Sequence, residues 1–488
     1  MKRRLGFLLP ILLLASCQTS PVINEAQRLY DTFWSNETKL RLELTLSQAN
    51  LEAIETYGKD KNTQFNDYYF PANLRLTVND TVYEMEEVGV RQKGNIFSRG
   101  PFLNEEGFLS TPFHFRLSFD QTYDEDFYAP LGLKKTWLNG EPAYETRQSR
   151  RLFGMKSLEL KWNRSNDPSL INQVYASSLY RQHDVLAPQS TLSAVSIMTE
   201  QQGHDIGLYT INEIVDEIFI RRHFLGAAGN GDLYKALWSN QLLYPAMVQV
   251  DGNTGLERFK PNFVGVENTE EGYHPVYDLK TNKNTSQHEA LMNLVKTLHT
   301  LNQIQDLSLR KSTFESVLDT EAFLNYAAIS YLIGNPDDMR NLTNNTYIYF
   351  HGVTKRAYFI PYDMDWSLGV TWDDELTQKM ATHSPLSIHD SFQQVIQNPL
   401  YWFTILDGFV TPANRYPRIA GYQEPYLSMI NTVANDAYFS EESFVSLFDT
   451  KQTLYDGMTF TLPSNSDFAS PDAFINHYQL ITATVKGN

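Results

Sequence analysis

Cysteine is almost absent from this sequence. The single cysteine, Cys17, stands among 488 residues, so the chain cannot form an internal disulfide bond. Long apolar runs are also missing, because the longest begins at Leu5 and ends at Leu14. A helix that crosses a bilayer needs about 20 predominantly apolar residues. We therefore expect no permanent membrane-spanning helix in this chain.

The first 17 residues have the pattern of an export signal. Basic residues at positions 2–4 precede the short apolar run, and two small residues precede Cys17. This order is typical of a secretory signal peptide. The small residues before the cysteine resemble the bacterial lipobox, in which the cysteine is acylated and begins the mature chain. An ordinary signal peptide with a chance cysteine is the alternative, but it would leave an unexplained free thiol in an exported protein.

The lipobox resemblance implies a signal peptide over residues 1–16, lipid on Cys17 and a tether over residues 17–35. The chain would then contact a membrane only through its lipid anchor. We expect the protein in the cell envelope, facing away from the cytoplasm. Gln18, rather than aspartate, after the lipidated cysteine is consistent with the outer membrane of a cell that has two membranes.

Basic residues are fewer than acidic ones, and this shortage excludes one class of partner. The sequence has 40 Lys and Arg against 57 Asp and Glu, which gives a formal net charge of −17. Such a chain is repelled by phosphate backbones, so nucleic acid is not expected as a partner. A content of 42% hydrophobic and 13% aromatic residues is typical of a globular protein. The length allows two or three domains or one large two-lobed fold.

Several common catalytic motifs are missing. The sequence has no Gly-x-Ser-x-Gly elbow, no His-Glu-x-x-His pair, no Cys-x-x-Cys pair and no P-loop. The Gly-rich stretch at 226–231 lacks the spacing of a dinucleotide-binding fingerprint. An Asp-x-Asp pair at 363–365 invites an EF-hand interpretation, but Leu368 occupies the position where that loop requires glycine.

Hydrophobic periodicity predicts a strand-rich first half and a helix-rich second half. Alternating or apolar runs predict strands at 40–46, 74–78, 81–91, 111–119, 157–162, 192–198, 207–212 and 233–237. Helices are expected from Asp167 to about His183, over 215–225 and from Asp319 to Gly334, followed by a hairpin of strands 346–350 and 356–360. We therefore assign residues 36–240 to an N-terminal lobe, 241–285 to an insertion and 286–488 to a helical C-terminal lobe that contains the hairpin.

The densest group of acidic and amide side chains lies between Gly334 and Gly369, around this hairpin. Mg²⁺ that is bound to substrate phosphates typically takes one or two carboxylates and a carbonyl-type oxygen from the protein. Protein kinases build this arrangement from a catalytic Asp, an Asn a few residues later and a metal-binding Asp. A capped helix end followed by a polar turn would give a similar pattern, so spacing alone leaves both interpretations open.

The same segment resembles the CotH family of kinase-like proteins. The family pattern runs Gly-Asn-x-Asp, then Asn-Tyr-x-x-Tyr, then Pro-Trp-Asp-x-Asp-x-x-x-Gly. Its matches lie at 334–337, 345–349 and 361–369, and further family-like segments lie at 90–95, 167–170, 207–209, 213–216 and 233–235. The resemblance implies an α+β, two-lobed protein-kinase-like fold with a strand-rich N-terminal lobe and a helix-rich C-terminal lobe.

The resemblance also assigns roles to individual residues. Asp337 would be the catalytic residue that orients or deprotonates the acceptor hydroxyl. Asn345 and Asp363 would hold Mg²⁺ or Mn²⁺, with Asp365 behind them. The remaining assignments concern ATP: the turn Lys93, Gly94 and Asn95 over the phosphates, Glu213 in support of the phosphate site, and Tyr234 with Lys235 near the base.

The function that the resemblance implies is metal-dependent transfer of a phosphoryl group from ATP to a hydroxyl of an envelope or surface protein. Three departures from the family pattern are visible. The loop between Asp337 and Asn345 is longer, the strand at 110–119 has Arg116 as its only basic residue, and Tyr362 replaces a tryptophan. Arg does not replace Lys freely at a phosphate. The alternatives are a non-catalytic binding or assembly module on the same fold, and transfer of the nucleotide moiety.

Overall fold

The computed structural model describes residues 25–59, 68–94, 99–137, 140–163, 167–236, 242, 277–387, 398–406, 418–462 and 467–487. The predicted signal peptide, Cys17 and Asn95 lie outside the described residues, as does most of the predicted insertion. Among the described residues, no helix combines the length and apolar character that a bilayer span requires.

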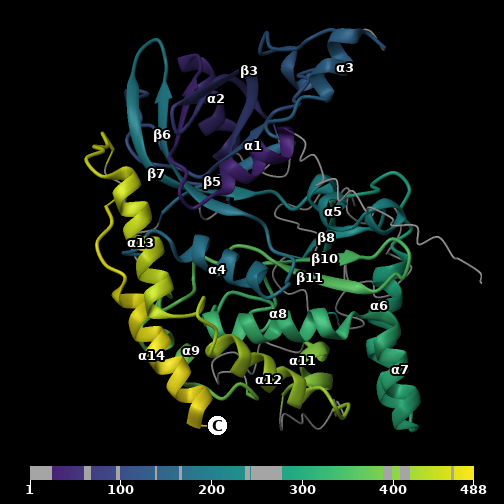
Figure 1. Cartoon of the computed structure of the whole chain (residues 1–488). Coiled ribbons are helices and arrows are strands. Elements are labelled where there is room, and N and C mark those ends of the chain that lie inside the picture. The colour runs from purple at the N-terminus through teal and green to yellow at the C-terminus, as the bar shows by residue number, and fades with distance from the viewer. Residues whose placement is uncertain are drawn as a thin grey trace, which may run out of the picture.

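The first half of the chain forms a closed seven-stranded barrel, drawn at the top of Figure 1. Its strands are β1 (Leu40–Thr45), β2 (Phe70–Val78), β3 (Thr81–Gln92), β4 (Phe115–Ser118), β5 (Ser157–Trp162), β6 (Ser190–Met198) and β7 (Gly203–Glu213). The order around the barrel is β1-β2-β3-β4-β5-β7-β6. The parallel pairing of β1 with β6 closes it, and the other pairs are antiparallel. Closure removes free strand edges, which otherwise attract other chains.

A second, four-stranded antiparallel sheet lies between the barrel and the long helix α8 (Figure 1). Its order is β11 (Ala357–Pro361), β10 (Thr346–Phe350), β8 (Leu233–Ala236) and β9 (Tyr277–Leu279). The predicted hairpin is therefore confirmed as β10 and β11. Strand β8, which lies in the predicted N-terminal lobe, pairs with β10. Strand β9, which we placed in the insertion, pairs with β8.

Helix α8 (Thr320–Ile333) forms the centre of the helical half. The carboxylate of Asp319 accepts a hydrogen bond from the Ala322 amide at 3.1 Å, which caps the first turn. The helix ends at Gly334, whose φ of 62° is a left-handed conformation that glycine adopts at low cost. Ten of its residues are buried, so it is a core helix rather than a surface one. Both predicted ends of this helix are confirmed.

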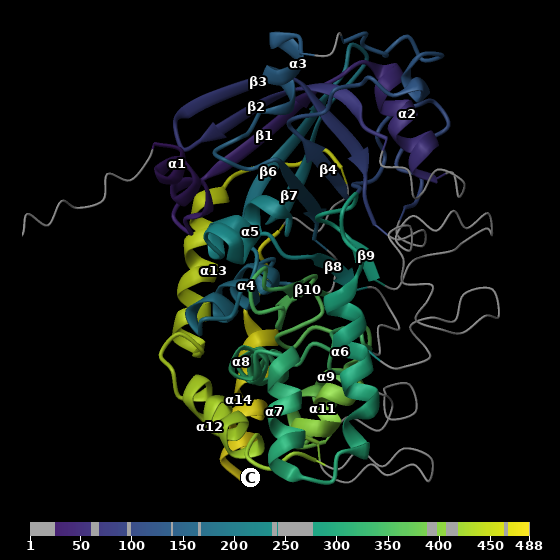
Figure 2. The same ribbon diagram turned by 90° about the vertical axis from the view of Figure 1, so that its right-hand side faces the viewer.

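The other helices surround this centre and the barrel. They are α1 (Glu25–Trp34), α2 (Gln48–Lys59), α3 (Pro142–Gln148), α4 (Asn172–Gln182), α5 (Glu217–His223), α6 (Glu289–Thr300), α7 (Leu307–Val317), α9 (Asp374–Thr382), α11 (Pro399–Thr404), α12 (Gln423–Ala434), α13 (Glu441–Tyr455) and α14 (Asp472–Gly487). Figure 2 shows α7, α11 and α12 at the end of the molecule away from the barrel.

Helix α13 ties the C-terminal half to the seam of the barrel. The Tyr455 hydroxyl donates to the Leu192 carbonyl at 2.6 Å and accepts from the Leu40 amide at 3.2 Å. Leu40 begins β1 and Leu192 lies on β6, the two strands whose parallel pairing closes the barrel. The buried Lys451 donates to the Thr191 hydroxyl at 3.1 Å on the same strand. Helix α13 therefore joins the C-terminal half of the chain to the two strands that close the barrel.

Two predicted boundaries differ from the structure for local reasons. Residues 25–34 fall in the predicted tether but form helix α1, which buries Tyr30, Phe33 and Trp34. The helix predicted to begin at Asp167 begins at Asn172 as α4. The Asp167 carboxylate accepts from the Ser169 amide at 3.0 Å and the Asn172 amide at 3.3 Å, which holds a turn before the helix.

Candidate active site

The β10–β11 hairpin brings the two proposed metal ligands together. Thr346 pairs with Pro361 at the end of its ladder, and the Tyr362 amide donates to the Asn345 carbonyl at 3.1 Å. Asn345 and Asp363 therefore lie just beyond the paired ends of neighbouring strands, at the same end of the sheet. Their φ angles of 48° and 59° are left-handed, a conformation that Asn and Asp tolerate better than most residues. Such strained positions gather at functional sites.

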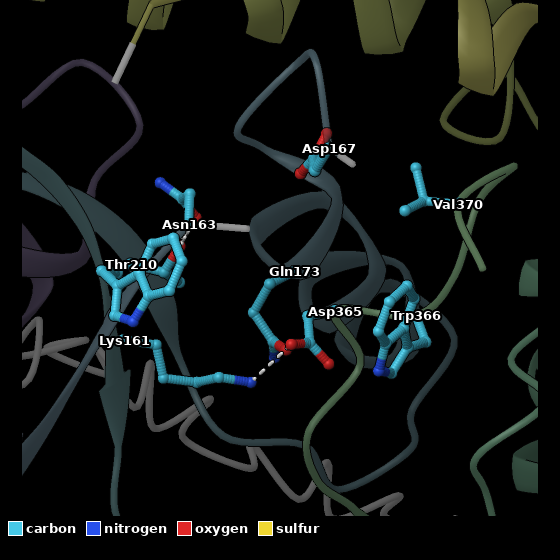
Figure 3. Close-up of a pocket in the computed structure, with 9 residues that line it drawn as sticks. Lys161, Asn163, Asp167, Gln173, Thr210, Asp365, Trp366 and Val370 are labelled. Atoms are coloured by element: carbon cyan, nitrogen blue, oxygen red, sulfur yellow. Dashed lines mark hydrogen bonds and ion pairs between the residues drawn. The ribbon is translucent and has the colours of Figure 1, made fainter. Parts of the chain in front are cut away.

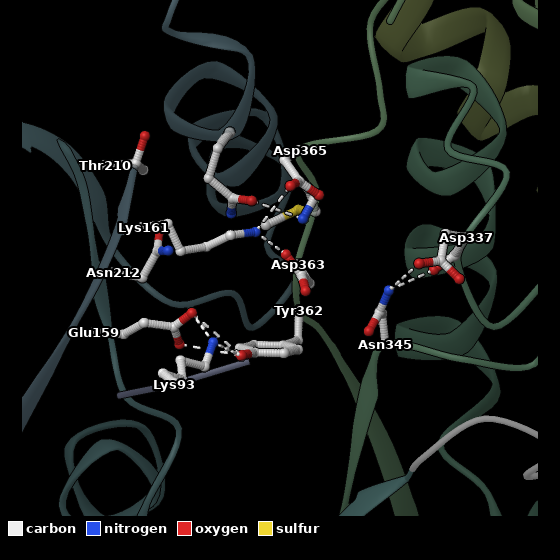
Figure 4. Close-up of polar contacts among 12 residues, drawn as sticks. Lys93, Glu159, Lys161, Thr210, Asn212, Asp337, Asn345, Tyr362, Asp363 and Asp365 are labelled. Carbon is white, nitrogen blue, oxygen red and sulfur yellow. Dashed lines mark hydrogen bonds and ion pairs between the residues drawn. The ribbon is translucent and has the colours of Figure 1, made fainter. Parts of the chain in front are cut away.

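Asp337 lies in the loop after α8 and faces this hairpin end (Figure 4). The Asn345 amide donates to its carboxylate at 2.9 Å and to its backbone carbonyl at 2.8 Å, and the Asn344 amide donates to the other carboxylate oxygen at 2.9 Å. Partial burial raises the pKa of Asp337 to about 6, aided by the charges of Asp363 and Asp365 and opposed by the two amide hydrogen bonds. The side-chain oxygen of Asn345 points away from Asp337 (Figure 4).

The carboxylate of Asp363 is ion-paired with Lys161 from β5, which also reaches Asp365 at 3.1 Å (Figure 4). Burial acts to raise the pKa of Asp363, but the charges of Lys161 and Lys93 outweigh it and hold that pKa well below its usual range. Burial acts to lower the pKa of Lys161, and the two carboxylates reverse this and raise it. Asp363 and Lys161 are therefore both charged at neutral pH.

Two more lysines converge on the same place from different strands. Lys93, just beyond β3, contacts Glu159 on β5 and the hydroxyl of Tyr362. The amino groups of Lys93 and Lys235 lie 5.0 and 4.4 Å from the centre of the Tyr362 ring. Burial, with the charge of Lys280, lowers the pKa of Lys235 to about 8. Lysine is a common point-charge partner for phosphate, and three of them meet here beside Asp363.

Glu159 and Lys161 were not among the predicted site residues. Both lie on the strand that we predicted at 157–162, two residues apart and thus on one face. Glu159 is 1% exposed and Lys161 is 7% exposed. Two charged residues alternating with leucine in a predicted strand were the available signal, because a buried charge normally needs a partner of opposite sign.

Two residues that the resemblance assigns to ATP binding, Glu213 and Tyr234, contact other side chains of the protein. Glu213 accepts from the Tyr30 hydroxyl at 2.8 Å and from the Gln189 amide at 3.1 Å, and it is ion-paired with Arg222. It therefore holds α1 and α5 against the end of β7. The Tyr234 side chain is buried, and its hydroxyl lies 2.7 Å from Nδ1 of His288. Gly94, beside Lys93, has a φ of 118°, and the predicted turn continues outside the described residues.

Helix α14 packs directly behind the two loops that carry the acidic residues. Nε2 of His477 lies 2.7 Å from the Leu332 carbonyl at the end of α8. A side chain at Gly334 would meet His477 at 2.6 Å, and one at Gly369 would meet the Ala473 carbonyl at 2.0 Å. Both glycines also have positive φ angles, of 62° and 86°. The close approach of α14 therefore explains why these two loop positions are glycine.

The donor set of this site fits a Mg²⁺ ion that also binds nucleotide phosphates. Asp363 offers a carboxylate and Asn345 an amide oxygen, a combination that such ions use when phosphates and water supply the remaining ligands. Among the described residues, no group of three or more His, Cys, Asp and Glu side chains is placed to hold a metal by itself. The site fits a shared ion rather than an all-protein metal cage.

Comparison with known proteins agrees with the resemblance. The family model described as CotH kinase protein matches residues 131–447, and the chain belongs to this family. No curated protein gives a significant match. Among solved structures, the Helicobacter pylori proinflammatory kinase CtkA is 12% identical, with coverage of 68% of this chain and 90% of that chain. Its TM-score of 0.28 is too low to support an argument about shared architecture.

Replacing Lys161 tests whether it serves as a counter-ion for the acidic pair. Lys161→Met leaves Asp363 and Asp365 without their cation. Breaking a fully buried ion pair costs about 3–5 kcal/mol, and the partial exposure of both carboxylates should reduce this. In the presence of a chelator, we expect Lys161→Met to melt at a lower temperature than the wild type. Added Mg²⁺ should partly restore the melting temperature of the variant, as measured by thermal unfolding.

The matched control is Lys156→Met. Lys156 precedes β5 and contacts Asp120 and Glu217 at 3.5 Å, with 37% of its side chain exposed. Its loss should change stability little, with no added response to Mg²⁺. An identical Mg²⁺ response in the wild type and Lys161→Met would contradict the counter-ion role.

Proposed function

We propose that this chain is an exported, lipid-anchored phosphotransferase that uses Mg²⁺ or Mn²⁺ and ATP to modify a hydroxyl of an envelope or surface protein. The observation that carries the proposal is the hairpin end, where Asn345 and Asp363 flank adjacent strand ends and Asp363 lies among the charges of Lys161, Lys93 and Lys235. Membership in the CotH kinase protein family supports the same class of reaction. A kinase-like arrangement of two lobes with the site between them is part of this proposal.

The residues divide into three tasks. Asp363 and Asn345 would hold the divalent ion, which supplies charge neutralisation on the phosphates when it is bound. Lys93, Lys161 and Lys235 would bind and orient phosphate oxygens by charge. Asp337, placed by the amides of Asn344 and Asn345, would accept the proton of the acceptor hydroxyl. Lys161 would exchange its pairing with Asp363 for a phosphate oxygen when nucleotide binds.

The test of the proposal is calorimetric titration of the folded chain with Mg²⁺-ATP, with ATP plus chelator as the control. We expect saturable binding that depends on the divalent ion. No binding by a protein with a cooperative thermal transition would overturn the proposal. The mass added to an acceptor then distinguishes transfer of a phosphoryl group from transfer of the nucleotide moiety.

A non-catalytic binding or assembly module is the second candidate. One observation favours it: Asp363 and Asp365 are both already ion-paired with Lys161, so each carboxylate has a cationic partner without a metal. The titration described above separates the two, because a module of this kind would show no Mg²⁺-dependent nucleotide binding.

The location is tested at Cys17. If this residue carries lipid, Cys17→Ser should release the protein from the membrane fraction or leave its precursor uncleaved, because the apolar anchor is lost. Cell fractionation and the mass of the N-terminal peptide measure both effects. Gln18→Ala, one residue further on, is the control and should leave attachment and processing intact. Unchanged membrane attachment and processing in Cys17→Ser would contradict lipidation.

A further inference from the structure

The end of helix α5 and the tip of the β10–β11 hairpin form one continuous surface. The Phe224 ring, just after α5, lies 4.9 Å from the Tyr349 ring on β10 and 5.2 Å from the Tyr358 ring on β11, measured between ring centres. In the turn that follows, the Ala228 carbonyl accepts from the Gly352 amide at 2.9 Å. Two segments that are far apart in the sequence are therefore fixed side by side.

The outer side of this surface carries basic and apolar side chains, which we call the α5–hairpin patch. Its members are Arg221, Leu225, Val353, Lys355 and Arg356, all of them exposed. Val353 is 62% exposed, and Leu225, at 81%, is the most exposed large apolar side chain among the described residues. Within the same described part of the chain, the three cations have no ion-paired carboxylate. Single exposed leucines are ordinary, but apolar side chains beside unpaired cations suit a bilayer surface.

The acidic side chains of the neighbouring segments already have partners. Asp216 accepts from the first amides of α5, and Glu217 is ion-paired with Lys156 at 3.5 Å. Asp319 accepts from the Tyr358 hydroxyl at 2.9 Å. The hairpin itself, residues 346–361, contains no acidic residue. The patch is therefore locally positive on a chain whose formal net charge is −17.

Helix α1 packs against the same part of α5 (Figures 1 and 2). The Arg222 guanidinium lies 4.0 Å from the centre of the Tyr30 ring, and both side chains contact Glu213. Helix α1 begins at Glu25, and Cys17 precedes it by eight positions. An extended chain of that length spans at most about 28 Å. Lipid on Cys17 would therefore keep a bilayer within reach of α1 and of the neighbouring patch.

Another surface near α1 has the opposite charge. A groove between the segment after α1 and helix α13 is lined by Glu37, Glu442 and Asp449, and its lining contains no basic residue. Anionic headgroups repel such a surface and attract basic residues. Of these two surfaces beside α1, the α5–hairpin patch is therefore the one that is complementary to anionic phospholipid.

We propose that the α5–hairpin patch is a second membrane contact, which docks on the anionic headgroups of the bilayer that holds the lipid on Cys17. This inference rests on the lipid anchor of the proposed function. The three cations would lie among the phosphates, while Leu225 and Val353 would enter the boundary between headgroups and acyl chains. An acidic protein would match the same charges, but the short tether keeps headgroups at a high local concentration and favours the bilayer. The lipobox resemblance implies the anchor as the only membrane contact, and the patch would add a second one.

This contact would set the distance between the bilayer and the candidate active site. The patch includes the tip of the hairpin, whereas Asn345 and Asp363 flank the other end of β10 and β11. The Lys161–Asp365 ion pair, which Figure 3 shows, also lies at that other end. Strands of five residues separate the two ends by about 17 Å. Docking through the tip would therefore hold the site away from the headgroups, where a protein acceptor can reach it.

The test is vesicle binding by the mature chain, residues 17–488, with Cys17→Ser so that no anchor can form. Vesicles of phosphatidylglycerol and phosphatidylcholine supply an anionic surface, and vesicles of phosphatidylcholine alone supply a neutral one. Co-sedimentation at low and high salt measures the bound fraction. We expect binding to the anionic vesicles that weakens at high salt, and much weaker binding to the neutral vesicles.

Reversal of two patch charges tests whether the patch makes this contact. Arg221→Glu with Lys355→Glu should weaken binding to anionic vesicles by at least about 25-fold, because each cation near such a surface contributes about fivefold. The matched control is Lys311→Glu with Lys486→Glu, which changes the net charge equally on α7 and at the end of α14. This control should bind within about threefold of the starting chain, because charges beyond the screening length contribute little. Thermal melts establish that each variant is folded.

A dye on a single cysteine identifies the surface that meets the lipid. Cys17 is the only cysteine of the chain, so Val353→Cys in the Cys17→Ser background supplies the only thiol. An environment-sensitive dye at this position should shift its emission to shorter wavelength on anionic vesicles. Leu309→Cys is the control, because Leu309 is 56% exposed on α7, at the end of the molecule away from the barrel (Figure 2). A dye at Leu309→Cys should not respond.

The outcomes separate this inference from the proposed function. Absence of binding to anionic vesicles overturns the patch, favours an acidic protein as its partner, and leaves lipidation and phosphoryl transfer standing. Equal losses in the two double variants, or equal dye responses at the two positions, also overturn it. Vesicle binding through the patch, together with cellular Cys17→Ser protein that stays attached after a high-salt wash, supports the patch and contradicts lipidation. The affinity for Mg²⁺-ATP should be the same in every variant, so its absence concerns the phosphotransferase alone.

Discussion

Asp363→Asn is expected to weaken Mg²⁺-dependent ATP binding by at least about 100-fold. Loss of residues that merely support metal ligands already costs about 10–100-fold in metal affinity, and Asp363 supplies the carboxylate itself. Asparagine has nearly the same shape and tolerates the left-handed backbone at this position, where φ is 59°. The substitution therefore removes charge with little strain. Calorimetry with Mg²⁺-ATP, beside a thermal melt, measures the effect.

The control for this experiment is Asp374→Asn, because Asp374 is an exposed aspartate in the first turn of α9. It should bind Mg²⁺-ATP as the wild type does. Lys161 keeps its contact with Asp365 in the Asp363 variant, so the fold should persist. If the wild type binds ATP and Asp363→Asn binds it equally well, Asp363 is not the metal ligand.

Asp337→Asn should separate transfer from binding. Asp337 contacts Asn344 and Asn345 but lies outside the lysine group around Tyr362, so nucleotide affinity should stay within about threefold of the wild type. The rate of transfer to an acceptor should fall by about 10²–10⁴-fold, which is the usual contribution of a positioned acid or base. Single-turnover transfer of labelled phosphate, with ATP affinity from calorimetry, measures both quantities.

The control variant for this second experiment is Asp338→Asn. Asp338 is buried and contacts the Ser330 hydroxyl and the Asn341 amide, so it holds the loop in place. Asp338→Asn should lower the melting temperature, whereas Asp337→Asn should not. A transfer rate in Asp337→Asn equal to that of the wild type would remove Asp337 from the reaction.

The sequence predicted the local secondary structure around the candidate site well. Asp319 and Gly334 mark the ends of α8 because a side-chain cap and a left-handed glycine act within one turn. The hairpin that is flanked by Asn345 and Asp363 is likewise a short-range unit, so spacing and the family resemblance could place these two proposed ligands at one end of it. Asp337 belongs to the same segment, since it precedes Asn345 by only eight positions.

The remaining features of the fold and of the candidate site depend on contacts between residues that are distant in the sequence. Lys161 meets Asp363 across 202 positions of sequence, and no periodicity predicts that pairing. The barrel closes because β1 pairs in parallel with β6, two strands that are separated by most of the N-terminal half. Glu213 matched a family-like segment, yet its position at the end of β7 turns it toward Tyr30 and Arg222. Alternation identifies which strands have a buried face, but not which partner each one takes.

The closure of the barrel has a practical consequence for anyone who divides this chain into fragments. The matched range 131–447 begins after β4 and ends before α14. A recombinant fragment cut at those limits would lack β4, which pairs with β5, and β1, which pairs with β6. Its β5 and β6 would then be unpaired edge strands that can pair with other copies of the fragment. It would also lack Lys93 and the helix that carries His477. Such a piece should aggregate on expression, so the working unit for biochemistry extends at least from helix α1 to helix α14.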